Sequence, residues 1–553
     1  MIQIALLILL LVTLPATAAA RGVESLKAGN EAVTRGDAEA ALAHYTRAIE
    51  DQRLAPHDLS LAYRSRAALY LRSGHHDRAI QDLDAAIRLD PTDASAFNNR
   101  GRAYSHRGEY DRAIENYTDA VRLDPGFAEA YYNRGLAYRR TGEHDRAIQD
   151  YDVVIRLNAQ DASAFSNRGN AYSAKEEWDR AIQDYDAAIR LNASFADAFY
   201  NRGVALRKKG LLDKAIQDFD AALRLDPNDS MALTNRGLAY TFKRQDDRAI
   251  QDYDAAIRLD PGNAVAFYYR GNAYRNKNEG NRAIQDYDTA LRLDRNYAAA
   301  YNNRGIAYYN RDEWDRAIAD YDVAIGLEPG SALYVLNRGL AYSGKGDWER
   351  AIRDYDAAIR LNPHGADAFF ERGLAHTKQG AWEQAVRDFD AAVGLNEKNA
   401  ANYFSRGRTR FYLGYFTAAQ PDLAKAVELA QNNPYNPLWL YLARVRSGQE
   451  PKEARDELAA HAKRLNLARW PAPLYAVYLG NATPAAVLAS AADNDSQRHR
   501  QQLCEAYLYL GQHAVIREDQ QDAQRMLKSA ASTCPPTTSD YASAQAELKR
   551  LAR

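Results

Sequence analysis

The chain of 553 residues is poor in the residue types that mark metal centres and redox sites. It contains only two cysteines, three methionines and eleven histidines. It has no His-Glu-x-x-His pair, no paired-cysteine redox motif, no phosphate-binding loop and no nucleophile elbow. These absences exclude the common zinc, thiol-redox and serine-hydrolase motifs. We therefore expect no metal, no cofactor and no enzymatic activity.

An excess of charge of one sign is also missing. The 72 Lys and Arg residues and the 73 Asp and Glu residues give a net charge of −1. A near-neutral chain has no overall electrostatic attraction to nucleic acid or to an anionic membrane. We therefore expect no nucleic-acid partner.

The N-terminus carries an apolar run, Ile2 to Leu14, that is too short to span a bilayer comfortably. It leads through Pro15 to a small-residue stretch that ends before Arg21. This order is typical of a secretory signal peptide with its cleavage site. We expect residues 1–20 to be removed, leaving no stable membrane span. An uncleaved membrane anchor is the alternative.

The sequence is rich in one respect, because an Arg-Gly dipeptide returns every 34 residues without slippage. Its arginines are Arg100, Arg134, Arg168, Arg202, Arg236, Arg270, Arg304, Arg338, Arg372 and Arg406. A fixed period of this length indicates a solenoid, in which each unit stacks only on its neighbours. Such an array offers a long surface for holding other chains rather than a pocket for chemistry.

Each period predicts two helices joined by a tight turn. In the unit that contains Arg100, the apolar spacing predicts helices over 94–107 and 110–123, and Gly108 tolerates the backbone angles of the turn. Pro125 is expected to end the second helix, since proline cannot continue it. Several units lack this proline, and we expect a longer or softer turn there. The positions concerned are Ala159, Ala193, Arg295, Glu397 and Gln431.

The chain resembles the tetratricopeptide repeat (TPR) family in the pattern aromatic-x3-Gly-x2-Tyr, then Ala-x3-Tyr-x2-Ala. One unit that carries it consists of Phe267, Gly271, Tyr274, Ala283, Tyr287 and Ala290. The resemblance implies an all-α, right-handed superhelix of antiparallel helix pairs. About twelve repeats occupy residues 21–433, and residues 434–553 are expected to form a degenerate helical cap over the end of the stack.

The C-terminal part resembles bacterial envelope TPR adaptor proteins, which include outer-membrane lipoprotein adaptors. The lipid-bearing cysteine of those lipoproteins is missing. The resemblance implies a non-catalytic scaffold in the bacterial cell envelope, located in the periplasm, whose partners are other proteins. A glycan- or peptidoglycan-binding protein is the alternative. A hydrolase in residues 434–553 is a third reading that no group of residues supports.

An asparagine stands directly before most of the repeated arginines. These residues are Asn99, Asn133, Asn167, Asn201, Asn235, Asn303 and Asn337. In TPR arrays this part of the first helix faces the concave groove, and protein-binding members carry an asparagine ladder there. An amide offers both a donor and an acceptor to the backbone of an extended peptide. The resemblance therefore implies a peptide-binding groove, and local packing or capping is the alternative role.

Basic residues gather near the ends of several first helices and form a predicted basic tract. Its members are Arg139, Arg140, Arg207, Lys208, Lys243 and Arg275. The tract would favour acidic segments of a partner. The alternative is that these cations complement the helix dipole, which favours positive charge at any helix C-terminus.

A second repeated feature is the Asp-x-Asp pair, for example Asp150 and Asp152, which occurs nine times at one position of the second helix. One copy could suggest a metal site, but a catalytic site is built once, and positions i and i+2 of a helix face different sides. We expect each repeated arginine, such as Arg134, to pair with an aspartate of its own or a neighbouring unit. Such pairs specify register more reliably than they add stability.

The two cysteines, Cys504 and Cys534, fall in the predicted cap, in a helix pair expected over residues 501–512 and 520–531. In an antiparallel pair the start of the first helix lies beside the end of the second. A disulfide is therefore geometrically plausible, and an exported protein would keep it oxidised. Two buried free thiols are the alternative.

Overall fold

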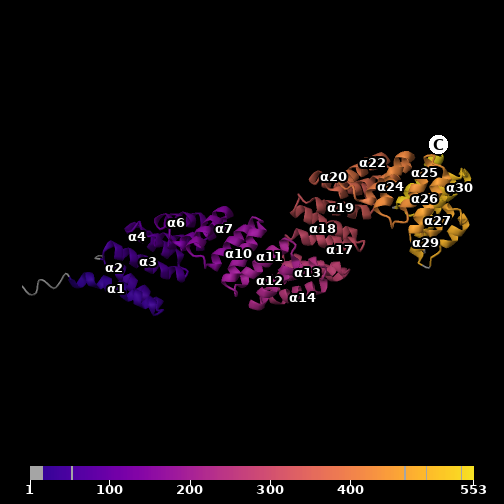
Figure 1. Ribbon diagram of the computed structural model, residues 1–553. Coiled ribbons are helices and arrows are strands. Elements are labelled where there is room, and N and C mark those ends of the chain that lie inside the picture. The colour runs from indigo at the N-terminus through magenta and orange to yellow at the C-terminus, as the bar shows by residue number, and fades with distance from the viewer. Residues whose placement is uncertain are drawn as a thin grey trace, which may run out of the picture. The chain divides into compact units, whose positions relative to one another are not determined.

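The computed structural model of the protein shows an all-helical chain whose helices follow one another in antiparallel pairs (Figure 1). It describes residues 16–51, 54–465, 467, 469–493, 495–536 and 538–552. No strand occurs within these residues. The predicted all-α fold of stacked helix pairs is confirmed. Most of the predicted signal peptide, residues 1–20, lies outside the described residues, and only the backbone of its last five residues is described.

The helices form two compact units that are described separately, an N-terminal unit up to Tyr269 and a C-terminal unit from Arg270. The division falls within α15 (Ala264–Asn276). The N-terminal unit contains α1 (Ala16–Thr34), α2 (Ala38–Glu50), α3 (Pro56–Arg72), α4 (His76–Leu89), α5 (Ala94–His106), α6 (Tyr110–Leu123), α7 (Ala128–Thr141), α8 (His144–Leu157), α9 (Ala162–Ala174), α10 (Trp178–Leu191), α11 (Ala196–Lys208), α12 (Leu212–Leu225), α13 (Ser230–Phe242) and α14 (Asp246–Leu259).

The C-terminal unit continues the same pairing and then departs from it. Its repeat helices are α16 (Gly280–Leu293), α17 (Ala298–Tyr309), α18 (Trp314–Leu327), α19 (Ala332–Gly344), α20 (Trp348–Leu361), α21 (Ala366–Lys378), α22 (Trp382–Leu395), α23 (Ala400–Leu413) and α24 (Phe416–Leu429). Beyond them lie α25 (Asn436–Arg446), α26 (Pro451–Arg464), α27 (Ala472–Tyr478), α28 (Pro484–Ser490), α29 (Ser496–Ile516), α30 (Gln520–Thr533) and α31 (Ser539–Leu551).

In most repeats a glycine of the first helix lies against an aromatic ring of the second. A Cβ atom added to Gly101 would come within 2.6 Å of Cε1 of Tyr117, and one at Gly135 would meet the Tyr151 ring at 2.9 Å. The rings of Tyr117 and Tyr151 are almost fully buried. The repeated glycine is therefore required for close approach of the two helices, and any larger side chain would push them apart.

In most repeats an Asp or Asn side chain, rather than proline, makes the turn that leads to the next repeat. The second helix α6 ends before Asp124, whose Oδ1 accepts from the Gly126 amide at 2.9 Å. In the next repeat, which lacks proline, α8 ends before Asn158, whose Oδ1 accepts from the Gln160 amide at 3.0 Å. The two turns have the same length, so the prediction of longer turns without proline is wrong. The side-chain bond stops the helix in both cases.

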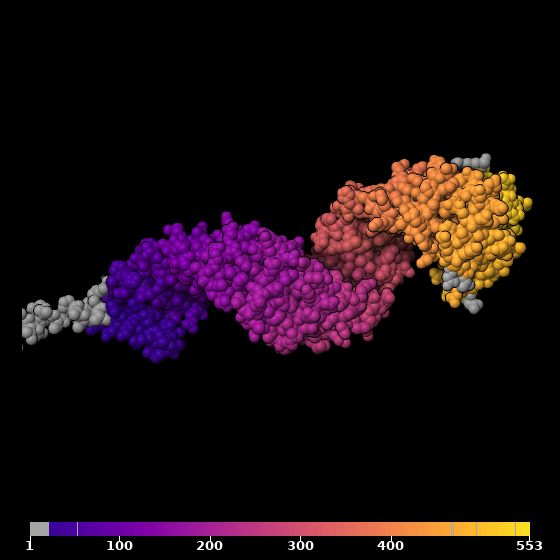
Figure 2. Space-filling model, viewed as in Figure 1, coloured from indigo at the N-terminus to yellow at the C-terminus, as the bar shows by residue number. Residues whose placement is uncertain are grey.

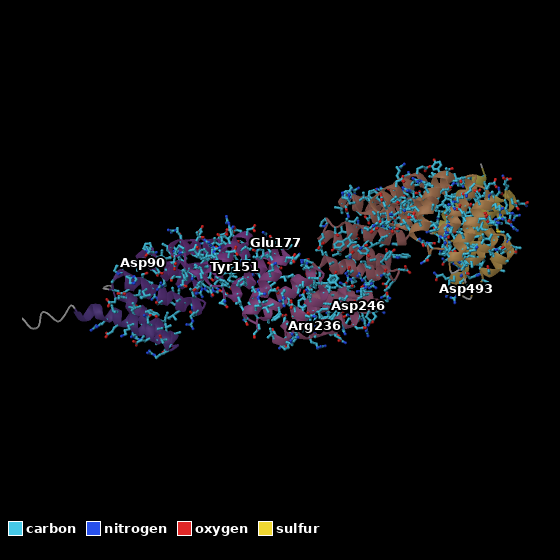
Figure 3. All side chains as sticks on the ribbon, viewed as in Figure 1. Asp90, Tyr151, Glu177, Arg236, Asp246 and Asp493 are labelled. Atoms are coloured by element: carbon cyan, nitrogen blue, oxygen red, sulfur yellow. A yellow bond between two sulfur atoms is a disulfide. The ribbon has the colours of Figure 1, made fainter. Side chains whose placement is uncertain are left out.

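The repeated arginines connect neighbouring repeats as well as the two helices of their own repeat. Arg236, labelled in Figure 3, donates through Nε and Nη2 to the carboxylate of Asp252 at 2.9 and 2.6 Å. Its Nη1 donates to Asp220 of the preceding repeat at 2.6 Å. The Asp252 side chain is 9% exposed and that of Asp220 is 38% exposed. The same arrangement occurs at Arg168, Arg202, Arg304, Arg338, Arg372 and Arg406.

The predicted pairing of the repeated arginines with aspartates is therefore confirmed. We call this series of ion pairs the arginine ladder, and it explains the Asp-x-Asp pair. The first aspartate serves the arginine of its own repeat, and the second serves the arginine of the next repeat. Burial raises the pKa of Asp252, and the bond from Arg236 offsets part of that rise. A buried ion pair of this kind gives little net stability but strongly penalises the loss of one partner.

The helices beyond α24 build a single non-repeating core, here called the cap. Trp439, Tyr441, Tyr475, Tyr478 and Leu508 are all buried in it. In the space-filling view the orange and yellow atoms of this part form one continuous mass (Figure 2). The cap therefore resembles a small globular domain more than a further stack of repeats.

Candidate peptide-binding surface

The first helices of successive repeats line the inner side of the stack. In the N-terminal unit α5 contacts α7, α7 contacts α9, and α9 contacts α11, in addition to the contacts within each pair. The second helices α6, α8 and α10 share no comparable contact with one another. Helices that approach one another more closely lie on the inside of a curved stack. We call this side, formed by the first helices, the inner face.

All seven asparagines of the predicted groove lie on first helices and are half-buried. Five of them donate a side-chain hydrogen bond to a residue of the preceding repeat. The bonds are Asn133 to Asn98, Asn167 to Tyr132, Asn235 to Tyr200, Asn303 to Asn272 and Asn337 to Asn302, at 2.8 to 3.1 Å. These hydrogen bonds therefore connect neighbouring repeats along the inner face, which is the local packing role given as the alternative to peptide binding.

Both polar atoms of the Asn167 side-chain amide already form hydrogen bonds. Its Nδ2 donates to the Tyr132 hydroxyl at 2.9 Å and to the Ser163 carbonyl at 3.0 Å, and its Oδ1 accepts from Nη1 of Arg139 at 2.7 Å. Asn235 repeats the pattern with Tyr200, Met231 and Arg207. These amides have little capacity left for a ligand unless they exchange partners.

Asn201 differs from its neighbours on either side. The preceding repeat offers it Ser166 where Asn167 meets Tyr132 and Asn235 meets Tyr200, and a serine is too short to reach. Within the described residues the Asn201 side chain forms no hydrogen bond. Its amide is thus the one in this stretch whose donor and acceptor are both open to a peptide backbone.

The predicted basic tract is divided by the structure into groups with different surroundings. Arg139 and Arg207 lie on the inner face and hold asparagine oxygens, and neither forms an ion pair within the described residues. Lys243 is bound by Asp213 of the preceding repeat, while Arg140 and Lys208 are exposed. Arg275 belongs to the C-terminal unit and is half-buried.

Arg207 is the most unusual of these cations. It is surrounded by Tyr200, Tyr253 and Tyr269, its Nε is buried without a hydrogen-bond partner, and burial lowers its pKa. A buried guanidinium without a carboxylate is costly, and an acidic group of a ligand would relieve that cost. The sequence signal for the open amide of Asn201 is the alternation of Tyr132, Ser166 and Tyr200 over successive repeats, which can be seen only when neighbouring repeats are compared.

The inner face ends differently in the C-terminal unit, because α31 packs against α21 and α23. Arg550 of α31 donates to the carbonyls of Phe411 and Tyr412 at the end of α23. Glu547 of the same helix is fully buried and lies 3.5 Å from Arg446. The last repeats therefore have their inner face covered by the chain itself, an arrangement that the repeat pattern did not predict.

A disulfide joins Cys504 of α29 to Cys534 at the end of α30, with 4.8 Å between their Cα atoms. The first of these helices is longer than expected and starts at Ser496. The bond anchors the segment that leads into α31. Within the described residues there is no group of three or more metal-ligating side chains, and no described helix is long and apolar enough to cross a membrane.

Comparison with protein families gives a consistent result along the chain. A model of the tetratricopeptide repeat matches residues 26–94, 65–115, 98–162, 166–230, 218–264 and 336–400. Further TPR and tetratricopeptide repeat models match residues 271–312, 298–327 and 400–433. No curated protein matches the chain in sequence.

Solved structures that resemble the chain include YrrB, described as a TPR protein with an unusual peptide-binding site. It is 27% identical over 33% of this chain and 95% of its own, with a TM-score of 0.30. Yeast Tom70 is 16% identical over 70% of this chain and 95% of its own, with a TM-score of 0.37. A tetratricopeptide repeat protein from Parabacteroides merdae is 21% identical over 45% of this chain and 98% of its own, with a TM-score of 0.38.

Proposed function

We propose that this chain, which belongs to the tetratricopeptide repeat family, holds extended peptide segments of partner proteins along the inner face of its N-terminal unit. The repeats support a role as a protein–protein interaction scaffold, and repeats of this family are typical of non-catalytic proteins. The observation that carries this proposal is the polar chemistry of the inner face that lacks partners, namely the open amide of Asn201 and, on the same helix, the guanidinium of Arg207, which faces no carboxylate.

The site suits an extended chain more than a compact ligand. The open amide of Asn201 can pair with both the N–H and the C=O of an extended backbone, and the asparagines of the neighbouring repeats can join it only by exchanging their present partners. The guanidinium groups of Arg139 and Arg207, two repeats apart, would favour carboxylates in the bound segment. We further propose that the protein is exported and acts as an adaptor in the bacterial cell envelope, which rests on its N-terminal signal-like segment.

The test is a pull-down from envelope extract with the chain from Arg21 onward. The parent is compared with a variant that carries Asn201→Ala and Arg207→Gln, and with a control that carries Lys214→Ala and Arg224→Gln on α12 of the same repeat. We expect the inner-face variant to lose proteins that the parent and the control both retain.

Circular dichroism of all three proteins checks that they are equally folded. Equal retention by the inner-face variant and the parent would move the interaction away from this surface and contradict the proposal. If the parent retains no protein but binds glycan strands, the glycan-binding alternative replaces it. Recovery of the parent's partners only from cytoplasmic extract would contradict the envelope location alone.

A further inference from the structure

A cavity of about 230 Å³ lies where α31 crosses the inner face of the last repeats. Its apolar wall consists of Leu374 from α21, Trp382 and Phe389 from α22, and Phe404 from α23. The start of α31 closes the other side through Ser539, Ala542 and Ser543. The cavity is separate from the surface proposed above for peptides, since all of its walls belong to the C-terminal unit.

The volume and the walls suit a single ring. A cavity of about 150 Å³ lined by Leu, Ile and Phe side chains is large enough to bind benzene. This cavity is larger by an amount that would hold a short chain attached to such a ring. Aromatic and aliphatic walls with a few polar groups are also typical of small-molecule sites.

The polar end of the cavity is a buried guanidinium. The Arg408 side chain is 16% exposed, and its nearest carboxylate oxygen, in Asp540, is 3.6 Å away, beyond hydrogen-bonding distance. Its Nη2 donates a long bond of 3.3 Å to Oγ of Ser543. Its carbon centre lies 5.3 to 5.9 Å from the centres of three aromatic rings, those of Phe404, Tyr412 and Trp439. This arrangement leaves N–H donors of Arg408 without a strong acceptor.

A second donor at the cavity is the hydroxyl of Tyr412. The residue is 6% exposed, and its hydroxyl oxygen has no hydrogen-bond partner. The neighbouring Ser543 hydroxyl is committed elsewhere, because it donates to the Ser539 carbonyl at 2.6 Å and accepts from Arg408. A buried hydroxyl without a partner carries a desolvation cost that a ligand acceptor would remove.

The charges around the cavity are unequal. Lys378, at the end of α21, is half-buried and forms no ion pair within the described residues. Burial, and then the charge of nearby Arg408, lower its pKa to about 8. Asp540 is the carboxylate that faces both cations. One positive charge is therefore left over in a place of low dielectric constant, which favours an anion.

We propose that this cavity binds a ring-sized apolar group joined to a carboxylate. The ring would lie against Trp382 and Phe389, and the carboxylate would accept from Arg408 and the Tyr412 hydroxyl. The group can be a free aromatic acid or the last residue of a partner chain, since both present the same chemistry. Either would sit beneath α31 and join it to the repeats.

The test is calorimetric titration of the full chain with 3-phenylpropionate and with its neutral amide, 3-phenylpropanamide. We expect the acid to bind at least about tenfold more tightly, because its two hydrogen bonds from charged and buried donors are absent or weaker in the amide. Two short peptides that end in phenylalanine, one with a free and one with an amidated C-terminus, identify the source. Tighter binding of the free-acid peptide than of 3-phenylpropionate assigns the site to a chain end, and the reverse assigns it to a small acid.

Two variants place the ligand in this cavity. Tyr412→Phe should weaken binding of the acid about tenfold without lowering the melting temperature, since the hydroxyl has no partner to lose. Thr377→Leu should fill the cavity and abolish binding. Thr241→Leu, at the same position of a repeat in the N-terminal unit, is the matched control and should bind as the parent does.

Equal affinity for the acid and the amide would overturn the anion assignment. Binding that survives both Tyr412→Phe and Thr377→Leu would overturn the location, and failure of every probe to bind the parent would overturn the proposal. None of these results bears on peptide binding by the N-terminal unit, whose variants are different.

Discussion

The repeats and the cap use different means to hold helices together. In the repeats, the same contacts recur from one repeat to the next. The contact of Gly101 with Tyr117 is one example of close helix packing, and the ion pair of Arg236 with Asp252 is one example of a bond that fixes the register of two helices. In the cap, contacts occur once. Glu505 is buried and accepts from Tyr435, Trp470 and Gln501 at 2.8, 2.7 and 3.1 Å. The repeating sequence leaves the inner face of the N-terminal unit open, whereas α31 of the cap covers the inner face of the last repeats.

The largest effect should come from the cap core. Trp439 is 1% exposed and packs against Phe411, Tyr412 and Tyr509. Trp439→Ala removes this packing and should lower the free energy of unfolding by about 3–5 kcal/mol. Hydrogen exchange should locate the loss in α23 to α31 and leave the N-terminal unit protected. A uniform loss along the chain would contradict the separate behaviour of the cap.

Loss of one ladder partner should come next. Arg236→Leu leaves the buried Asp252 carboxylate without its cation and should cost about 3 kcal/mol, measured by urea denaturation. The double variant Arg236→Leu with Asp252→Leu removes both charges and should recover most of that loss. If the single variant keeps both the midpoint and the steepness of the transition, the ladder has no structural role.

A smaller, pH-dependent effect is expected at Glu371, which replaces the usual asparagine before Arg372. Burial, and then the charge of Asp367, raise the pKa of Glu371 to about 7. A raised carboxyl pKa gives stability that is present at acid pH and is lost as the pH rises from about 4.5 to about 7. Glu371→Gln should therefore be more stable than the parent at pH 8, by roughly 2 kcal/mol, and equal to it near pH 4.

The measurement for Glu371→Gln is the melting temperature of parent and variant between pH 4 and pH 8. Glu349→Gln on the exposed side of α20 is the control and should follow the parent at each pH. A constant difference between Glu371→Gln and the parent across this range would show that ionisation of Glu371 is not the cause.

The smallest effect concerns the turn within a repeat. Arg244 has a φ of 60° at the position where other repeats have glycine, for example Gly210 with a φ of 78°. Arg244→Gly should stabilise the protein by about 0.5–1 kcal/mol, since a side chain disfavours this conformation. Gly210→Ala should destabilise it by a similar amount. A loss of stability in Arg244→Gly, seen by thermal denaturation, would show that the Arg244 side chain forms contacts that outweigh its backbone strain.

The sequence predicted those features that recur every 34 residues. The helix pairs, the close approach at Gly101 and the pairing of Arg134 with Asp150 all follow from position within the period. The prediction of longer turns without proline is wrong, because in most repeats an Asp or Asn side chain, and not proline, ends the second helix.

The features that the sequence could not predict are contacts between residues that lie far apart in the chain and do not follow the 34-residue period. The contact of α31 with α23 connects Ser543 and Arg408, which are 135 positions apart, and the 34-residue period does not predict it. The bonds that occupy Asn167 were also missed, because they depend on Tyr132 in the preceding repeat and on Arg139. Peptide binding by the asparagines thus stays a prediction, now centred on Asn201.

The most direct test of the account is photo-cross-linking from defined positions of one repeat. A photo-reactive amino acid replaces Asn201 on the inner face of α11 or, as control, the exposed Lys214 on α12. After irradiation in envelope extract, mass spectrometry identifies the cross-linked segments. The account predicts that Asn201 captures extended segments of partner proteins and that Lys214 does not. Capture of the same proteins from Lys214, with none from Asn201, would contradict it.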